Sequence, residues 1–374
     1  MAKPPQIPSV LAAPLVMLKA KGGMEMSETS KIRPWVLLLS LWLALFWGMA
    51  SYRAGPEEPA VTCAATERTL VPVGKTVGIK LFSHGVMVVR LSEVETQAGS
   101  ISPAERCGLR VGDIITEMQG RSVNTIEEVE AVLRDADGAP LALQVSRNGK
   151  ALRMTTRAAR CCADGSYKLG AWVRDSMAGI GTVTWYDPQT RRFAALGHGV
   201  TDVDTGQLIP LKSGAVMPAS VSGVMRGGQG CPGQLHGSFD LSHDLGSLTA
   251  NSSRGIFGTA YDDSFAGKPV PVARRSEVKT GTASILCNIE GTDVQEYDVE
   301  ILRIYPESAS ECQNLMIQVT DEALLSATGG VIQGMSGSPI LQNGALVGAL
   351  THVLVNDPTR GYGILAEKML ERME

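Results

Sequence analysis

The hydrophobic positions of this 374-residue chain follow two patterns, and the first is one long apolar run. Residues 34–52, PWVLLLSLWLALFWGMASY, carry no charge, and Lys31 and Arg33 precede them. Because a helix needs about 20 residues to cross the hydrocarbon core of a bilayer, this run predicts a transmembrane signal anchor. The small residues GMA, ending at Ala50, also form a credible cleavage site, so a removed signal peptide is the alternative.

Both alternatives export the chain after residue 53, because the basic flank stays inside. We expect residues 1–33 to be a disordered cytoplasmic N-terminus. Residues 53–66 begin RAGPEEP, whose Pro, Gly and Glu predict a linker. The expected location is therefore extracytoplasmic, on a single N-terminal membrane helix or released from it by cleavage.

Beyond the linker the second pattern begins, in which short apolar runs alternate with glycine-rich turns. This pattern predicts a mainly β protein. One segment departs from it: SPAERCGLRVGDIITEMQGRSVNTIEEVEAVL, residues 102–133, contains a short helix, a strand and an amphipathic helix. The apolar face of that second helix is expected to comprise Ile126, Val129, Val132 and Leu133. Hairpin turns are predicted at Asn148-Gly149 and at Asn343-Gly344.

The order of elements in residues 67–158 resembles a PDZ domain of the bacterial protease-associated kind. The resemblance rests on SPAERCGL (102–109), VGDII (111–115) and Gly120. It implies an α+β domain that binds peptide tails by strand addition. The carboxylate-binding loop is expected at Gly78, Ile79, Lys80 and Leu81, where successive amides would bind an anion. The alternative is that Gly78 is only a turn entering a strand.

Charge and cysteine content exclude some classes of protein. With 34 Lys and Arg against 38 Asp and Glu, the formal net charge is −4, which argues against a nucleic-acid binder. The seven cysteines include no C-x-x-C pair, so a zinc ribbon or thioredoxin-type site is not supported. A disulfide such as Cys231 with Cys287 is one interpretation, and buried free thiols are the other.

The strongest chemical signal lies in GVIQGMSGSP, residues 330–339. Gly334-Met335-Ser336-Gly337-Ser338-Pro339 resembles the nucleophile loop of chymotrypsin-like serine proteases. In such a loop the Ser336 hydroxyl projects, and the amides of Gly334 and Ser336 form the oxyanion hole. Ser338 is the alternative nucleophile, and a Gly/Ser turn without chemistry is the alternative to both.

A hydroxyl nucleophile needs a general base, and the chain has five histidines. His198 lies between two glycines and precedes the serine, which is the chain order of the chymotrypsin type. His84 is expected on a surface loop and His352 at a strand end. His236 and His243 are seven residues apart without a third ligand spaced to suit, so neither a metal site nor a cofactor is predicted.

A third residue must orient the imidazole and stabilise its protonated form. The candidates are Asp321, Asp202, Asp204 and Asp357. Asp321 ends the apolar strand LMIQV (315–319), just before the loop that leads to the serine. An acid at the end of a core strand can be held rigidly, but spacing alone leaves the four candidates open.

The chain as a whole resembles the stage IV sporulation protein B serine peptidase family. The matching blocks are YDPQT…ALGHGVTDVDTG, VTDEALLSATGGVIQGMSGSPILQNG and THVLVNDPTRGYG, together with the apolar run and the PDZ-like module. The resemblance implies a triad of His198, Asp321 and Ser336, with Asp357 as second choice for the acid. It also implies a chymotrypsin-like double β-barrel peptidase domain over residues 165–374.

The same resemblance implies a biological role. Such a peptidase acts in the space between forespore and mother cell, where it cleaves itself and a regulatory subunit of an intramembrane protease, and a late sigma factor is then activated. Two classes of function remain open. One is an exported serine endopeptidase whose PDZ domain docks substrate tails, and the other is a membrane-tethered PDZ adaptor with an inactive protease-like domain. The intact His, Asp and Ser set favours the peptidase.

Overall fold

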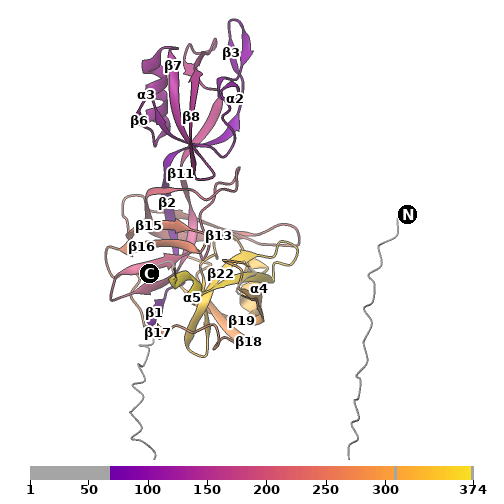
Figure 1. The fold of residues 1–374 in the computed structure, drawn as a ribbon. Helices are drawn as coiled ribbons and strands as arrows, with labels where there is room; N and C mark the ends of the chain where they lie inside the picture. The colour runs from indigo at the N-terminus through magenta and orange to yellow at the C-terminus, as the bar shows by residue number, and fades with distance from the viewer. Residues whose placement is uncertain (1–67, 307–309, 372–374) are drawn as a thin grey trace, which may run out of the picture. The chain divides into compact units, whose positions relative to one another are not determined.

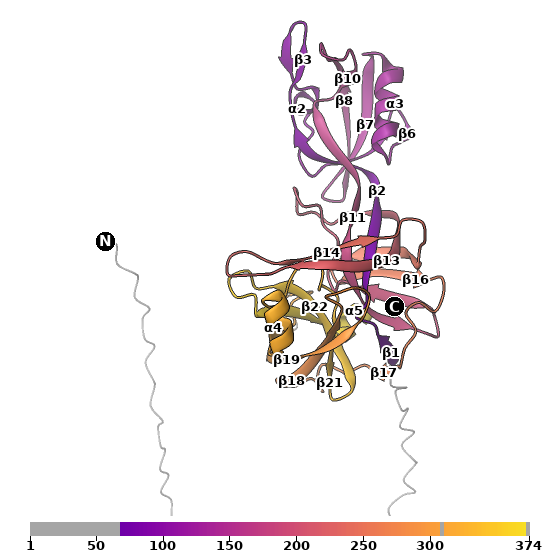
Figure 2. The same ribbon diagram turned by 180° about the vertical axis from the view of Figure 1, so that it is seen from behind.

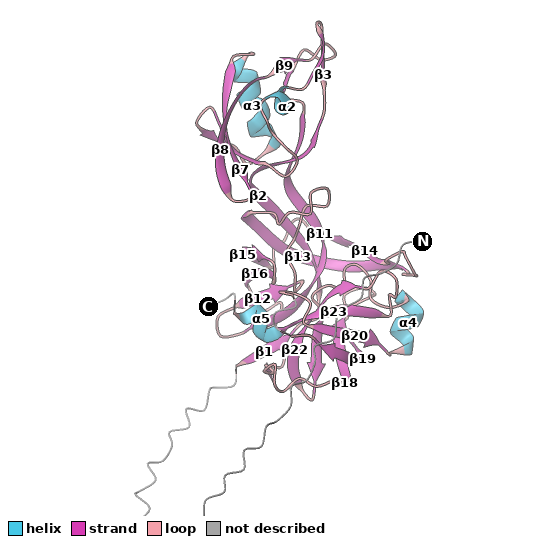
Figure 3. Ribbon diagram, turned by 45° about the vertical axis from the view of Figure 1, so that its right-hand side comes forward, coloured by secondary structure: helices cyan, strands magenta, loops and turns pink. Residues whose placement is uncertain are grey.

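The computed structural model describes residues 68–306 and 310–371, and the mainly β class expected for them is confirmed. Figure 3, in which strands are magenta, shows few and short helices among many strands. The strands form two barrels and an α/β module that is inserted into the first barrel.

The first barrel is a ring of six strands that is closed by the pairing of β2 with β11. In ring order they are β11 (Ala171–Asp187), β12 (Arg192–Ala195), β16 (Gly255–Ala260), β15 (Gly246–Ser252), β13 (Leu211–Met225) and β2 (Thr76–Leu91). Three further strands extend it: β1 (Thr69–Pro72), β14 (Gln234–Phe239) and β17 (Val270–Pro271). Its core contains the aromatic side chains of Tyr186, Phe193 and Phe265.

The second barrel is also closed and has six strands. They are β18 (Gly281–Cys287), β19 (Gln295–Ile304), β20 (Leu315–Val319), β23 (Arg360–Leu365), β22 (Ala345–Val353) and β21 (Pro339–Gln342). Strand β19 shows the alternation expected of a barrel strand: Tyr297, Val299 and Ile301 are buried in the interior while the residues between them are exposed. Two helices accompany this barrel, α4 (Glu322–Thr328) and α5 (Ala366–Leu370).

The α/β module is inserted between strands β2 and β11 of the first barrel. It contains β3 (Val94–Thr96), β4 (Gly99–Ile101), α2 (Pro103–Arg106), β5 (Ile114–Met118), β6 (Arg121–Ser122), α3 (Ile126–Ala136), β7 (Pro140–Arg147), β8 (Lys150–Arg157), β9 (Ala159–Arg160) and β10 (Tyr167–Lys168). Figures 1 and 2 show β2 and β11 running side by side from this module into the barrel. Both strands therefore belong to both domains.

Local sequence signals explain the helix and the turns of the module. Thr125 caps α3, and Glu128 reaches back to the cap residue, which completes a capping box. Val129, Val132 and Leu133 are buried as predicted, whereas Ile126 is only half-buried. The turn residues Asn148 and Asn343 both have positive φ, as the predicted two-residue hairpin turns require.

The sequence placed residues 67–158 in one domain, but part of this range pairs with barrel strands. Residues 69–72 pair with β11 and β17, and residues 76–82 pair with β11 and β13. Residues 69–72 therefore belong to the barrel, whereas the end of β2, at Val86 and Met87, pairs with β5 of the module.

No helix in residues 68–306 and 310–371 is long and apolar enough to cross a membrane. The predicted span at residues 34–52 lies outside these described residues. The described residues contain no membrane-spanning helix, so the expected fold class with an N-terminal transmembrane helix and the expected membrane-anchored location are corrected.

Candidate active site

The loop that carries Ser336 is held in place by two glycines with positive φ. Gly334 has φ +100° and Gly337 has φ +99°, a region that L side chains rarely adopt. A Cβ on Gly337 would also lie 2.0 Å from the carbonyl oxygen of Thr182. The glycines therefore allow the loop to turn sharply and to lie directly against the first barrel.

Ser336 and Ser338 differ in access, which spacing alone did not reveal. Ser338 is fully buried, and its hydroxyl donates to the carbonyl of Met335 at 2.8 Å. Ser336 is partly exposed and lines a pocket of about 550 Å³, which we call the catalytic pocket. The geometry thus favours Ser336 as the hydroxyl that a substrate could reach.

The amides expected to form the oxyanion hole are available. Within the described residues, neither the N–H of Gly334 nor that of Ser336 donates to another protein group. The loop around them is nonetheless anchored by Thr182 of β11, whose amide donates to the Ser336 carbonyl at 3.1 Å and whose hydroxyl donates to the Gly334 carbonyl at 2.9 Å. Preorganised, unpaired donors are what an oxyanion requires.

His198 is presented by a strained loop from the first barrel. Leu196 and Gly197 before it both have positive φ, and Leu196 is a bulky residue for which that conformation is unusual. A Cβ on Gly197 would meet Thr351 and Ile364 of the second barrel at 2.9 Å, and a Cβ on Gly199 would meet the carbonyl of Ser252 at 2.6 Å. Glycine on both sides of the histidine is therefore a requirement of close packing.

The environment of His198 sets its tautomer and its charge. Its Nδ1 lies 2.9 Å from the carbonyl oxygen of Gly199. Because a carbonyl only accepts, Nδ1 carries the proton and Nε2 keeps its lone pair. Burial lowers the pKa of His198, and the hydrogen bond to Gly199 opposes this in part. A neutral imidazole with a free Nε2 is the form that a general base needs.

His352, expected only as a strand-end residue, is a neighbour of the candidate base. Its ring centre is 4.9 Å from that of His198, and both side chains line the catalytic pocket. Part of the His352 side chain is exposed. Desolvation of the remainder and the nearby His198 lower its pKa to about 4. Only the fold reveals this proximity, because the two histidines are 154 positions apart in the sequence.

The nucleophile and the base lie in one pocket but are not hydrogen-bonded. The hydroxyl of Ser336 donates instead to the carbonyl of Thr351 at 2.7 Å. To hydrogen-bond to His198, this hydroxyl must first give up the Thr351 carbonyl. Such catalytic hydrogen bonds are often absent without substrate and form in the complex.

The four candidate acids lie away from the imidazole, each in another contact. Asp321 is the N-cap of α4: one carboxylate oxygen accepts from the amide of Leu324 at 2.9 Å, and the other lies 3.5 Å from the amide of Asp298. Asp202 and Asp204 pair with Arg174, and Asp357 lies 3.3 Å from Arg360. No hydrogen bond joins any of the four to His198 in the residues described.

The residues expected to form the carboxylate loop of the PDZ domain lie in a strand of the first barrel instead. Gly78, Ile79, Lys80 and Leu81 are in the middle of β2, paired with β11 on one side and with β13 on the other. Their amides cannot form an exposed anion site, because the ladders use both edges of the strand.

Among the described residues, the histidines and cysteines outside the pocket form no recognisable metal or disulfide centre. His84, His236 and His243 are exposed, and the described residues contain no group of three or more side chains suited to a metal ion. Six cysteines are described and all are free thiols, so Cys231 and Cys287 are not paired. Burial raises the pKa of Cys287 to about 12.

Comparison with known proteins supplies the family. The family described as SpoIVB peptidase S55 matches residues 165–370, more than half of the chain, and a PDZ domain family matches residues 96–147. The Rv3671c protease from M. tuberculosis, active form, is 18% identical with a TM-score of 0.30, covering 54% of this chain and 74% of that one.

The inactive form of the same protease is 16% identical with a TM-score of 0.28, covering 53% of this chain and 83% of that chain. Both TM-scores are below 0.5. The expected resemblance is confirmed by the family match over both domains. The chain belongs to the SpoIVB peptidase S55 family and is a serine peptidase with a PDZ domain.

Proposed function

We propose that the chain is a serine endopeptidase in which Ser336 is the nucleophile and His198 the general base. The observation that carries the proposal is that these two residues, from different barrels, line one pocket next to the unpaired amides of Gly334 and Ser336. The neutral, Nδ1-protonated imidazole of His198 adds the chemical state that the reaction needs.

The proposed reaction follows from these groups. Nε2 of His198 takes the proton of the Ser336 hydroxyl as the oxygen attacks the scissile carbonyl. The oxyanion of the tetrahedral intermediate accepts hydrogen bonds from the Gly334 and Ser336 amides. The imidazolium then donates its proton to the leaving amine, and an acyl-enzyme forms. Water, deprotonated by His198, hydrolyses that ester and regenerates the serine.

Asp321 is proposed as the third member on the family resemblance alone. Its carboxylate caps α4, so its role is separable by substitution. Asp321→Asn keeps an equally good capping group and should leave stability nearly unchanged. If the side chain acts on the imidazole, kcat should fall by about 10⁴. A fall of less than tenfold would assign the orientation of His198 to the Gly199 carbonyl alone.

The substrates we propose follow the family: this chain itself and a regulatory subunit of an intramembrane protease, whose cleavage leads to activation of a late sigma factor during sporulation. Peptide tails are proposed to dock on the PDZ domain. The alternative of a PDZ adaptor with an inactive protease-like domain is retained for testing, because the Ser336 hydroxyl is not hydrogen-bonded to His198.

A serine-reactive phosphonate tests the proposal against the adaptor. We expect covalent labelling that mass spectrometry maps to Ser336, and hydrolysis of a small activated ester. His198→Gln should abolish both, while His236→Gln, an exposed histidine outside the pocket, serves as the matched control and should change neither. A chain that is folded but neither labels nor hydrolyses the ester would refute the proposal and favour the adaptor.

A further inference from the structure

One edge of β11 is free where the strand passes from the PDZ domain to the barrel. Residues 171–182 pair with β2 along one edge, and pairing with β12 on the other edge begins only at Val183. Within the described residues, no strand or loop backbone pairs with that other edge over residues 171–181. We call this stretch the free edge; such an edge is a template for adding another strand.

The free edge leads directly to the catalytic serine. The amide of Val183 donates to the backbone carbonyl of Lys75, just before β2. The amide of Thr182 points the other way and donates to the Ser336 carbonyl at 3.1 Å. Because backbone groups alternate along a strand, Ala178 and Ile180 present their N–H and C=O groups to the same side as Thr182. Residues 177–180 also line the catalytic pocket.

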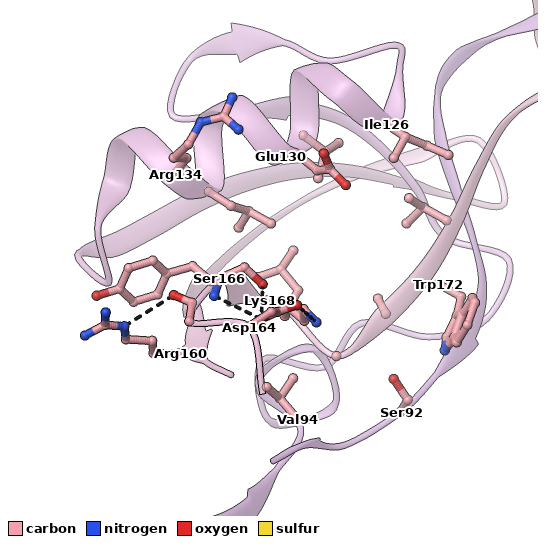
Figure 4. Close-up of a pocket in the computed structure, with 18 of the residues that line it drawn as sticks. Ser92, Val94, Ile126, Glu130, Arg134, Arg160, Asp164, Ser166, Lys168 and Trp172 are labelled. Carbon is pink, nitrogen blue, oxygen red and sulfur yellow. Dashed lines mark hydrogen bonds and ion pairs between the residues drawn. The ribbon is translucent and has the colours of Figure 1, made fainter. Parts of the chain in front are cut away.

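At its other end the free edge borders a second pocket, of about 1040 Å³, which we call the tail groove. It lies between α3 and residues 166–173. Ile126, the half-buried residue at the start of α3, and the strongly exposed Trp172 lie at one end of it (Figure 4). The amide of Ile126 donates to the Asp175 carboxylate at 3.0 Å, which ties α3 to β11.

The opposite end of the tail groove is suited to a carboxylate. Arg134 and Arg160 lie there (Figure 4). The amides of Leu169 and Gly170, just before β11, have no partner among the described residues, and Gly170 has φ +75°. Two of the four acids that line the tail groove are engaged: Asp164 pairs with Lys168 at 2.6 Å, and Asp137 interacts with the Tyr167 hydroxyl. The other two are Glu93 and Glu130.

Strand polarity links the two pockets. A peptide added antiparallel to β11 has its C-terminus at residues 169–171 and runs N-terminally toward Thr182 and Ser336. The residues that follow a scissile bond at Ser336 would therefore extend toward the tail groove, where a terminal carboxylate meets free amides and two arginines. An antiparallel peptide on the free edge can therefore place its terminal carboxylate in the tail groove and its scissile bond at Ser336 at the same time.

We propose that β11 seats one extended C-terminal tail across both pockets, so that the enzyme cuts at a set distance from a free carboxyl terminus. The inference rests on the proposed function. Ala171 and Ile180 are about nine residues apart, or roughly 30 Å at the ~3.3 Å rise of a strand. Pairing irregularities near Trp172 and Arg174 bend the strand, and the tail follows that bend. The released C-terminal fragment is therefore about eight to eleven residues long.

Peptides of uniform repeating sequence test this distance, because their own sequence favours no site. The full chain is incubated with such peptides of about 14, 18 and 22 residues, and fragments are identified by mass spectrometry. We expect C-terminal fragments of about eight to eleven residues from all three lengths. Fragment lengths that are scattered, or that are constant when counted from the N-terminus, would overturn the inference.

The carboxylate is tested separately. C-terminal amidation of the same peptides should lower kcat/KM by about tenfold or more, since a charge-assisted hydrogen bond is lost. Arg134→Glu should raise KM for free-acid peptides. The ratio of kcat/KM between free-acid and amidated peptides should become smaller. Arg153→Glu, an exposed arginine on β8 outside the groove, is the control and should change neither value. Equal cleavage of acid and amide would refute tail recognition.

Failure of this inference is distinguishable from failure of the proposed function. A wild-type chain that hydrolyses the activated ester and labels at Ser336, but shows no constant fragment length, would retain the peptidase and lose the tail rule. A chain inactive in all three assays would overturn both.

Discussion

Thr182 and Thr184 lie two residues apart on β11, are both fully buried, and differ in one interaction. The Thr182 hydroxyl donates to the Gly334 carbonyl at 2.9 Å, whereas the Thr184 hydroxyl has no partner among the described residues. Valine replaces the hydroxyl with a methyl group of similar size and keeps the β-branched shape that strands favour. The two Thr→Val substitutions therefore isolate a single hydrogen bond.

The structure predicts opposite effects on stability. Thr182→Val loses one neutral hydrogen bond and leaves a partly buried carbonyl without its donor, which should destabilise the fold by about 1–2 kcal/mol. Thr184→Val removes a buried hydroxyl that has no partner, so the fold should become about 1 kcal/mol more stable. Urea denaturation with unchanged slopes would measure both values.

The effect on catalysis should be confined to Thr182. The Gly334 carbonyl that it anchors belongs to the loop whose Gly334 and Ser336 amides we assign to the oxyanion hole. Complete loss of one such donor lowers kcat by about 10²–10³. Because the Thr182 amide still holds the Ser336 carbonyl, we expect a smaller loss in kcat, about tenfold or 1.4 kcal/mol of activation free energy.

Hydrolysis of a small activated ester is the appropriate assay, because it needs the oxyanion hole but not the tail groove. We expect kcat to fall for Thr182→Val and to be unchanged for Thr184→Val, with KM similar in both. Equal rates for the two variants would refute the prediction and show that the Thr182 hydroxyl does not position the nucleophile loop.

Three further predictions concern the serine and histidine side chains. Ser336→Ala should lower cleavage by about 10⁴–10⁶, whereas Ser338→Ala should lose about 1 kcal/mol of stability and remain active; the reverse result would move the nucleophile by two residues. Since burial lowers the pKa of His198, the acid limb of kcat/KM should lie below pH 6.5, and a limb above pH 7 would contradict its role as base. The folded-state pKa of His352, about 4, is below its unfolded value of about 6.5, so the unfolded chain binds the extra proton and Tm should fall between pH 6.5 and pH 4. Calorimetry of His352→Gln should show a smaller fall, and an identical one would argue against that shift.

Local sequence determined the parts of this protein that depend on a few adjacent residues. The turn at Asn343-Gly344 needs positive φ, and the alternating residues of β19 need one buried face, so both were predictable. Gly197, Gly334 and Gly337, next to His198 and Ser336, likewise have positive φ, which is a local reason for glycine at these positions. Their close approach to the opposite barrel, however, is visible only in the fold.

Choices between similar residues needed the tertiary structure. Ser336 and Ser338 are two positions apart in one loop, and only packing shows that Ser338 is buried against a carbonyl. The proximity of His352 to His198 arises because the two barrels meet at the pocket, a contact between distant segments. The capping role of Asp321 depends on where α4 begins, which the apolar pattern before it did not reveal.

The connection between the domains was decided by pairing over long sequence distances. Residues 78–81 read as a loop before a PDZ strand, but β11 and β13 enclose them, because both partners lie about 100 residues or more further along the chain. The strand that borders the tail groove is instead residues 171–173, after the segment that resembles a PDZ domain. A pattern of period two shows that a segment is a strand, but it does not show which strand lies beside it, since that depends on the free energy of the whole sheet.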